Sequence, residues 1–225
     1  MQAQDTTVFL LKLWPWVEAN KNRLIAGTVA IVVAAFVISF FFYQSAQREI
    51  AAGVALTRLA VTPGGPTAEA FFRVATDYAG TVAGQRAQLQ GAAELFDSGR
   101  YAEAQAEFQK FLDSHPDNQF SDQAALGVAA CLEAQGKPEA VSAYQQVADS
   151  SGNTAIVCAA KFALGRIEEA QGKFNEALNF YQDVARLDIG TSLGSEAEQR
   201  ATELRSKLPA SASTPAPTAP FELSH

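Results

Sequence analysis

The strongest constraint on the fold of this chain is an internal repeat. Three stretches carry the same series of residue types, and corresponding positions lie 36 or 37 residues apart. Each series begins with a glycine, continues with an alanine, and reaches an aromatic residue four positions after that alanine. The members are Gly99, Ala104 and Phe108, then Gly136, Ala140 and Tyr144, then Gly172, Ala177 and Tyr181. A period of this length is typical of stacked helix pairs, so the sequence predicts an all-α solenoid.

Each position of the series has a physical reason. Glycine ends a helix by adopting the left-handed backbone conformation. An acidic residue follows in the first turn of the next helix, where it interacts favourably with the helix dipole. The alanine lets two helices approach closely, and the aromatic ring fills the space one turn later. Pro116 follows the first series, where a helix should stop. The sequence therefore predicts helical hairpins that stack on one another.

These residues resemble the tetratricopeptide repeat over about residues 85–188, and we expect the array to occupy residues 85–208. The chain departs from that pattern because the usual tryptophan is absent and the second unit lacks a residue near Gly136. The resemblance implies a concave face that binds polypeptides. It also implies which residues form this groove. They are Phe96, Leu126, Phe162, Arg166 and Glu169. The alternative is that the three apolar side chains of this set belong to the core between helices.

An uncharged run from Leu24 to Tyr43 precedes the repeats. Its 20 residues would extend about 30 Å as a helix, which is the thickness of the hydrocarbon core of a bilayer. We therefore predict a transmembrane helix over residues 24–43. The alternative, a cleaved signal peptide, has a shorter apolar region, and the bulky residues at 41–43 form a poor cleavage site. Lys21 and Arg23 precede the run, so the positive-inside rule places the N-terminus in the cytoplasm.

The segments on either side of this run and of the repeats have distinct compositions. Residues 1–23 include Trp14 and Trp16, which prefer the level of the lipid headgroups together with Lys21 and Arg23, so we predict an amphipathic cytoplasmic segment. Residues 44–84 are predicted to be a linker and capping helices, interrupted by a proline and glycine cluster after which Thr67 caps a helix. Residues 209–225 are rich in Pro, Ala, Ser and Thr, which predicts a disordered tail.

The charged and reactive residues indicate neither catalysis nor binding of metals or nucleic acids. With 24 acidic and 17 basic residues, the chain lacks the positive charge that nucleic-acid binding requires. Cys131 and Cys158 do not form a CxxC motif, so we interpret them as buried apolar residues, with a disulfide as the alternative. The only histidines are His115 and His225. No motif of a hydrolase, metalloprotease or nucleotide-binding enzyme is present. The sequence thus predicts a protein that is not an enzyme and has no cofactor or metal.

The layout carries a second resemblance. A short segment with two tryptophans leads into the span as LWPWVEANKNRLIAG, and a repeat domain follows on the other side of the membrane. This is similar to the ancillary subunit of the bacterial SecYEG translocon. The resemblance implies an inner-membrane protein whose periplasmic repeats transfer exported proteins to chaperones. Its partners would then be translocon subunits and exported or unfolded polypeptides.

Two other assignments remain open at this point. Residues 107–127 resemble repeats of outer-membrane assembly and envelope coordination proteins, which favours an envelope scaffold with a fixed partner. An organellar import receptor would also have an N-terminal anchor, but it would place the repeats in the cytosol.

Overall fold

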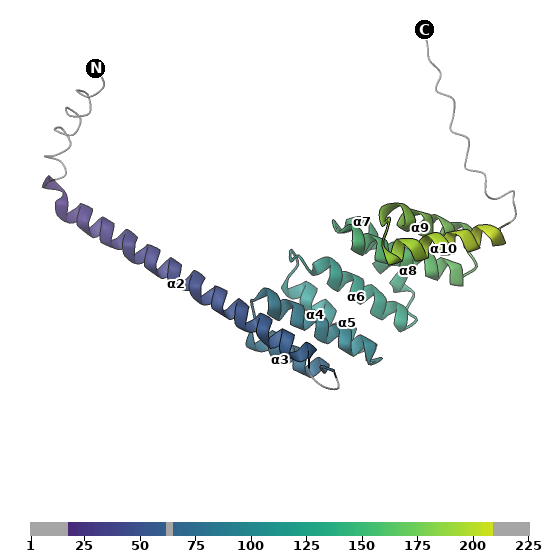
Figure 1. The fold of residues 1–225 in the computed structure, drawn as a ribbon, viewed down its shortest axis with the longest axis horizontal. Helices are drawn as coiled ribbons and strands as arrows, with labels where there is room; N and C mark the ends of the chain where they lie inside the picture. The colour runs from purple at the N-terminus through teal and green to yellow at the C-terminus, as the bar shows by residue number, and fades with distance from the viewer. Residues whose placement is uncertain (1–17, 62–64, 209–225) are drawn as a thin grey trace, which may run out of the picture.

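The computed structural model describes residues 18–61 and 65–208, and within these ranges the chain is entirely helical, as predicted (Figure 1). The predicted interfacial segment with Trp14 and Trp16, and the tail 209–225, lie outside these ranges. The helices are α2 (Lys21–Ala60), α3 (Ala68–Asp77), α4 (Val82–Asp97), α5 (Tyr101–Ser114), α6 (Ser121–Ala134), α7 (Glu139–Ser150), α8 (Thr154–Ala170), α9 (Phe174–Leu187) and α10 (Ser192–Lys207).

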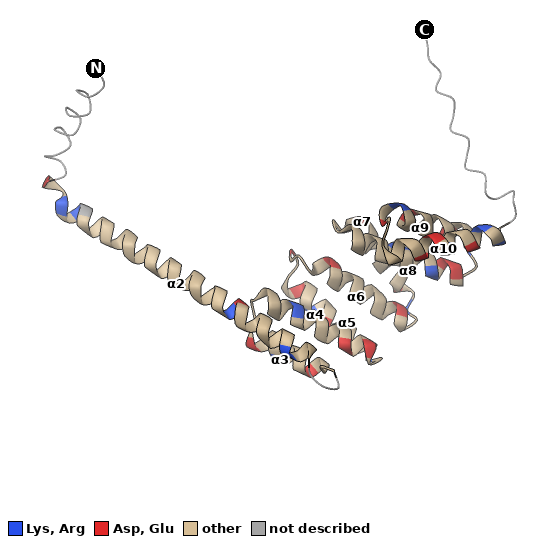
Figure 2. Ribbon diagram, viewed as in Figure 1, with Lys and Arg blue, Asp and Glu red and all other residues tan. Residues whose placement is uncertain are grey.

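Helix α2 projects from the rest of the molecule (Figure 1). It has 40 residues and is about 60 Å long at 1.5 Å per residue. Its apolar side chains face outward, since Ile31 is 71% and Phe36 is 73% exposed. Figure 2 shows an uncharged run along α2, and in the sequence this run extends from Leu24 to Gln47. Among the described helices, α2 alone is long and apolar enough to cross a membrane.

The other helices form an array in which each one packs against its predecessor along the chain. The even-numbered helices also contact one another, α4 with α6, α6 with α8 and α8 with α10, so they share one face of the array. The core is divided into three clusters along the array, centred on Phe111, Tyr144 and Tyr181. Such a sequence of local cores, without one common centre, is typical of a solenoid.

The turns within the hairpins follow the predicted glycine rule. Gly99, Gly136 and Gly172 have φ angles of +76°, +67° and +76°, in the left-handed region that favours glycine. The backbone N–H of Arg100 donates to the carbonyl of Leu95 at 2.8 Å, and the equivalent bond recurs after the other two glycines. This pattern satisfies carbonyls that a helix end would otherwise leave without donors. The three hairpins therefore reverse direction by the same local geometry.

The last turns of α2 are fixed to the start of the array. The backbone N–H groups of Val82 and Ala83, at the start of α4, each donate to one carboxylate oxygen of Glu49 at 2.9 Å. These donors have no partner within their own helix, and the helix dipole favours a negative charge there. Ala52, three residues after Glu49, is fully buried. Helix α2 is therefore attached to the first hairpin by a charged cap and by packing.

Candidate protein-interaction face

Polar side chains connect three successive helices where α6, α7 and α8 meet. The hydroxyl of Tyr144 on α7 donates to Oε2 of Glu133 on α6 at 2.7 Å. Arg166 on α8 forms an ion pair with Oε1 of the same carboxylate at 2.9 Å. We call this set the second junction. One carboxylate thus holds a residue from each of the two following helices.

The same arrangement recurs one repeat later, where α8, α9 and α10 meet. Tyr181 donates to Oε2 of Glu169 at 2.9 Å, and Arg200 approaches that oxygen at 3.5 Å. The guanidinium of Arg200 also lies 5.8 Å from the centre of the Phe162 ring. We call this set the third junction. Each glutamate lies three residues before the turn glycine, and each tyrosine four residues after the packing alanine.

The two tyrosines fill these junctions as neutral groups. Tyr144 is 3% exposed and Tyr181 is fully buried. Burial raises the pKa of both phenols above the usual range, and the hydrogen bond to a carboxylate raises it further. Each phenol therefore stays protonated and donates a hydrogen bond to the glutamate. The second and third junctions are closed by a satisfied polar network.

At the first junction, between α4, α5 and α6, the equivalent positions are all apolar. Phe96 replaces the glutamate, Phe108 replaces the tyrosine and Ala130 replaces the arginine. Here a pocket of about 220 Å³ remains open, and we call it the first-junction pocket. It is lined by Leu89, Ala93, Phe96, Asp97, Phe108, Gln123, Leu126, Gly127 and Ala130.

Close packing shapes one wall of the first-junction pocket. A Cβ atom at Gly127 would lie 2.7 Å from Cζ of Phe108, which is too close for any other residue unless the ring moves. On the other side, Phe96 packs edge-on against Tyr101 with ring centres 5.1 Å apart. The pocket is therefore bordered by two aromatic rings and by a backbone segment of α6.

The structure separates the residues predicted for a single groove. Phe96 and Leu126 line the first-junction pocket together. Phe162 is 8% exposed and packs against the ring of Tyr181, so it belongs to the core between helices. Arg166 and Glu169 lie in the second and third junctions. Lys21 and Arg23 lie in the exposed first turn of α2.

The predicted repeat-packing residues are all buried, apart from the turn glycines. The alanines of the series are at most 3% exposed and their aromatic partners at most 6% exposed. Sequence reasoning missed Glu133, Ala130 and Arg200. A comparison of equivalent positions across the repeats would have found the first two, because they lie three and six residues before the same turn glycine.

The two cysteines belong neither to the polar networks of the junctions nor to the lining of the first-junction pocket. Cys131 and Cys158 are fully buried, free, and in separate core clusters, which favours the buried interpretation over a disulfide. Burial raises the pKa of Cys131 to about 11 and also raises that of Cys158. Across residues 18–61 and 65–208, no three His, Cys, Asp or Glu side chains gather as a metal site.

Comparison with known proteins gives one result that bears on this architecture. No curated protein matches the sequence. The family model of the tetratricopeptide repeat-like domain, however, matches residues 15–141, which is more than half of the chain, includes all of α2 and ends within α7. Stacked repeats of this kind present extended faces that bind proteins. The chain therefore belongs to the tetratricopeptide repeat-like family, whose members are typically non-enzymatic scaffolds for protein interaction.

Proposed function

We propose that this protein is a membrane-anchored chaperone or adaptor that binds exported polypeptides and is associated with the translocon. The observation that carries the proposal is the first-junction pocket, an open apolar site where the later repeats are closed by polar side chains. Unfolded polypeptides expose the apolar side chains that folded proteins bury. A large apolar side chain of such a polypeptide would enter between Phe96, Phe108 and Leu126.

The arrangement of α2 supports an anchored role. We propose that residues 24–43 cross the bacterial inner membrane, with residues 1–23 in the cytoplasm. The linker and capping helices (44–84) and the repeats (85–208) would then lie in the periplasm, followed by the tail (209–225). Lys21 and Arg23 on one side of the apolar run favour this orientation. The Glu49 cap holds the first hairpin beside α2, so the first-junction pocket would stay near the membrane, where exported chains emerge.

Crosslinking from the pocket tests this function. A photo-crosslinking amino acid replaces Leu126 in the full-length protein, expressed in its native membrane, with α2 intact or with its apolar run replaced by an unrelated span. The same amino acid at Asn179, exposed on α9, serves as the control position. Translocon subunits and a range of exported proteins should be captured at position 126. A single stoichiometric envelope partner without the translocon would contradict the proposal and favour an envelope scaffold.

The sidedness of the array needs a separate test. Cys131 and Cys158 are fully buried, so a membrane-impermeant thiol reagent needs an introduced cysteine. Asn179→Cys provides an exposed thiol on α9. We expect labelling in spheroplasts whose inner membrane is intact. Labelling only after that membrane is opened would place the array in the cytoplasm and would contradict the periplasmic orientation.

A further inference from the structure

A second pocket lies where α2 leaves its apolar run. It has a volume of about 370 Å³ and lies between α2 and the turn that joins α3 to α4. Phe41, Gln44, Ser45 and Arg48 line it from α2, and these positions share one face of the helix. Ala79, Gly80 and Thr81 line it from the turn. We call it the α2–turn pocket.

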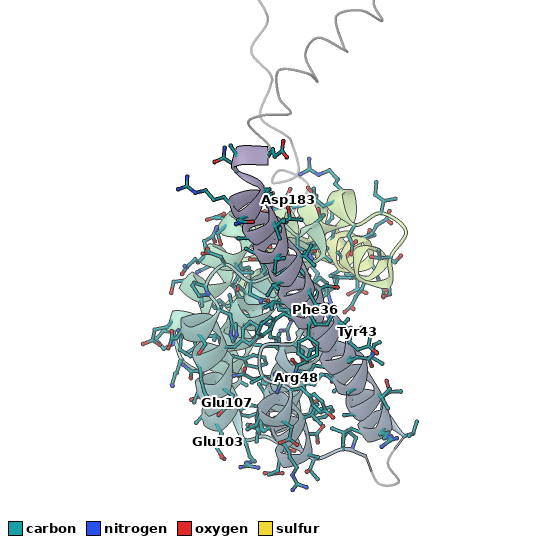
Figure 3. The ribbon with its side chains drawn as sticks, turned by 90° about the vertical axis from the view of Figure 1, so that its left-hand side faces the viewer. Phe36, Tyr43, Arg48, Glu103, Glu107 and Asp183 are labelled. Atoms are coloured by element: carbon teal, nitrogen blue, oxygen red, sulfur yellow. The ribbon has the colours of Figure 1, made fainter. Side chains whose placement is uncertain are left out.

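The position of the α2–turn pocket along α2 sets its depth in a membrane. Figure 3 shows Phe36, Tyr43 and Arg48 in this order along the helix. If residues 24–43 cross the bilayer, Arg48 lies about 7.5 Å beyond the end of the span, within the headgroup layer. Tyr43, 65% exposed, is an aromatic residue of the kind found at that boundary. Because the α3–α4 turn lines the same pocket, it lies at the same depth.

The charge in the α2–turn pocket is unbalanced. Within the described part of the chain, Arg48 pairs with no carboxylate. The carboxylate of the adjacent Glu49 lies at the start of α4 instead, where its two oxygens accept hydrogen bonds from Val82 and Ala83. Gln44 and Ser45 add an amide and a hydroxyl for which the described residues supply no partner. The hydroxyl of Thr81 is occupied, because it donates to the carbonyl of Tyr78 at 2.7 Å.

We propose that the α2–turn pocket binds the phosphodiester of an anionic phospholipid headgroup. The guanidinium of Arg48 would form two parallel hydrogen bonds to the phosphate oxygens, which is the geometry that arginine favours. Phe41, on the same face of α2 and about two turns closer to its N-terminus, would contact the adjoining acyl chain. The bound lipid would hold the first hairpin against the bilayer surface. This inference rests on the membrane anchoring proposed above.

Lipid retention by the purified full-length protein tests the site. Native mass spectrometry in detergent measures the binding of added phosphatidylglycerol. Arg48→Gln should weaken that binding about fivefold, the effect of one basic residue near an anionic surface. Arg48→Lys should restore part of it. Arg73→Gln, which removes one exposed charge from α3, should leave it unchanged. Equal binding by wild type and Arg48→Gln would overturn the proposal.

A second measurement places the α3–α4 turn relative to the membrane. A fluorophore on Ala79→Cys should be quenched by a headgroup-attached quencher in phosphatidylglycerol nanodiscs, and less so with Arg48→Gln. A fluorophore on Asn179→Cys should not be quenched. Inorganic phosphate should not change the signal, and a response to it without lipid would overturn the lipid assignment. Extraction of native membranes with alkaline carbonate separates the two proposals. Release of the protein contradicts anchoring, whereas a retained protein with an unquenched Ala79→Cys contradicts only the lipid site.

Discussion

The first junction and the two later junctions have the same backbone plan but opposite chemistry. In the later two, a tyrosine and an arginine from successive helices meet one glutamate, and the space is filled. In the first, Phe96, Phe108 and Ala130 occupy the equivalent positions and leave the first-junction pocket. The comparison teaches that the repeat sets where three helices meet, whereas the residues at three positions decide whether that place is closed or keeps an open pocket.

The energetic character of the two kinds of junction also differs. A buried polar network is stable only when all of its members are satisfied, so the later junctions tolerate little movement. An open apolar pocket loses dispersion contacts that its walls would otherwise make. A bound apolar side chain would restore those contacts and would therefore stabilise the first junction.

The largest expected effect comes from closing the first junction. Phe96→Glu, Phe108→Tyr and Ala130→Arg together would rebuild the later network at the first junction. We expect capture of exported polypeptides from position 126 to fall at least tenfold, because the side chains would fill the pocket and place charges in it. The thermal midpoint of the full-length protein, followed by circular dichroism in detergent micelles, should not fall. A folded triple variant that still captures clients would show that the pocket is not their site.

Opening a later junction should have the next largest effect, here on stability. Glu133→Ala and Glu169→Ala each leave a buried tyrosine hydroxyl without its acceptor. Arg166 also loses its ion pair with Glu133, whereas Arg200 keeps its ion pair with Glu196. We expect the free energy of unfolding to decrease by about 1–3 kcal/mol for each variant. Urea unfolding of the full-length protein in micelles measures the change. Glu198→Ala, at an exposed position of α10, is the matched control and should stay within about 0.5 kcal/mol. A loss no larger than in this control would mean that the network does not close the junction.

Two glycines, one at the third junction and one at the first-junction pocket, allow a comparison in which we expect a smaller effect on stability. A Cβ atom at Gly165 would lie 2.8 Å from Cε1 of Tyr181, and one at Gly127 would lie 2.7 Å from Cζ of Phe108. Tyr181 is fully buried and bonded to Glu169, so its ring cannot yield, whereas Phe108 borders open space.

Gly165→Ala should therefore destabilise the protein by about 1–2 kcal/mol, the cost of overpacking less the gain in helix propensity. Gly127→Ala should be near neutral, because its ring can move into the pocket. Urea unfolding of both variants side by side measures the difference. Equal losses would indicate that the wall of the first-junction pocket is as rigid as the third junction.

The sequence predicted the fold largely because the determinants of a repeat are local. Glycine at a left-handed turn, alanine at a crossing and an aromatic residue one turn later can all be read from spacing, and the turns at Gly99, Gly136 and Gly172 have the expected conformation. The uncharged run predicted a transmembrane helix over residues 24–43, and the structure has there a helix that is long and apolar enough to cross a membrane.

The placement of the groove residues could not be read in the same way. Leu126 and Phe162 hold equivalent places in their helices, yet only Leu126 lines an open pocket, together with Phe96. Phe162 is covered by Tyr181 and Arg200, which approach from two later helices. The Glu49 cap was also beyond sequence reasoning, because it joins residues more than 30 positions apart. Contacts between helices from different hairpins depend on how the repeats stack, and helical periodicity within one segment does not contain that information.

The last effect we predict distinguishes the junctions by pH. The phenols of Tyr144 and Tyr181 have pKa values raised above the ordinary 10.0, so the folded state holds their protons more tightly than the unfolded state. Their contribution to stability is complete below pH 10 and is lost as the pH rises above it, since the unfolded chain then releases protons that the folded chain retains. At the first junction Phe108 occupies the same place, so no phenol there contributes to this dependence.

Replacing both tyrosines by phenylalanine should therefore lower the stability at neutral pH by about 1 kcal/mol for each lost hydrogen bond, but should reduce the further loss above pH 10. Urea midpoints of wild type and of the double variant, measured from pH 7 to pH 11, test this. Cys131 remains in both proteins, so the loss that its raised pKa causes above about pH 9 cancels between them. If the urea midpoints of the two proteins fell in parallel above pH 10, the later junctions would have to open to water before their phenols ionise. The second and third junctions would then not be closed by their polar networks.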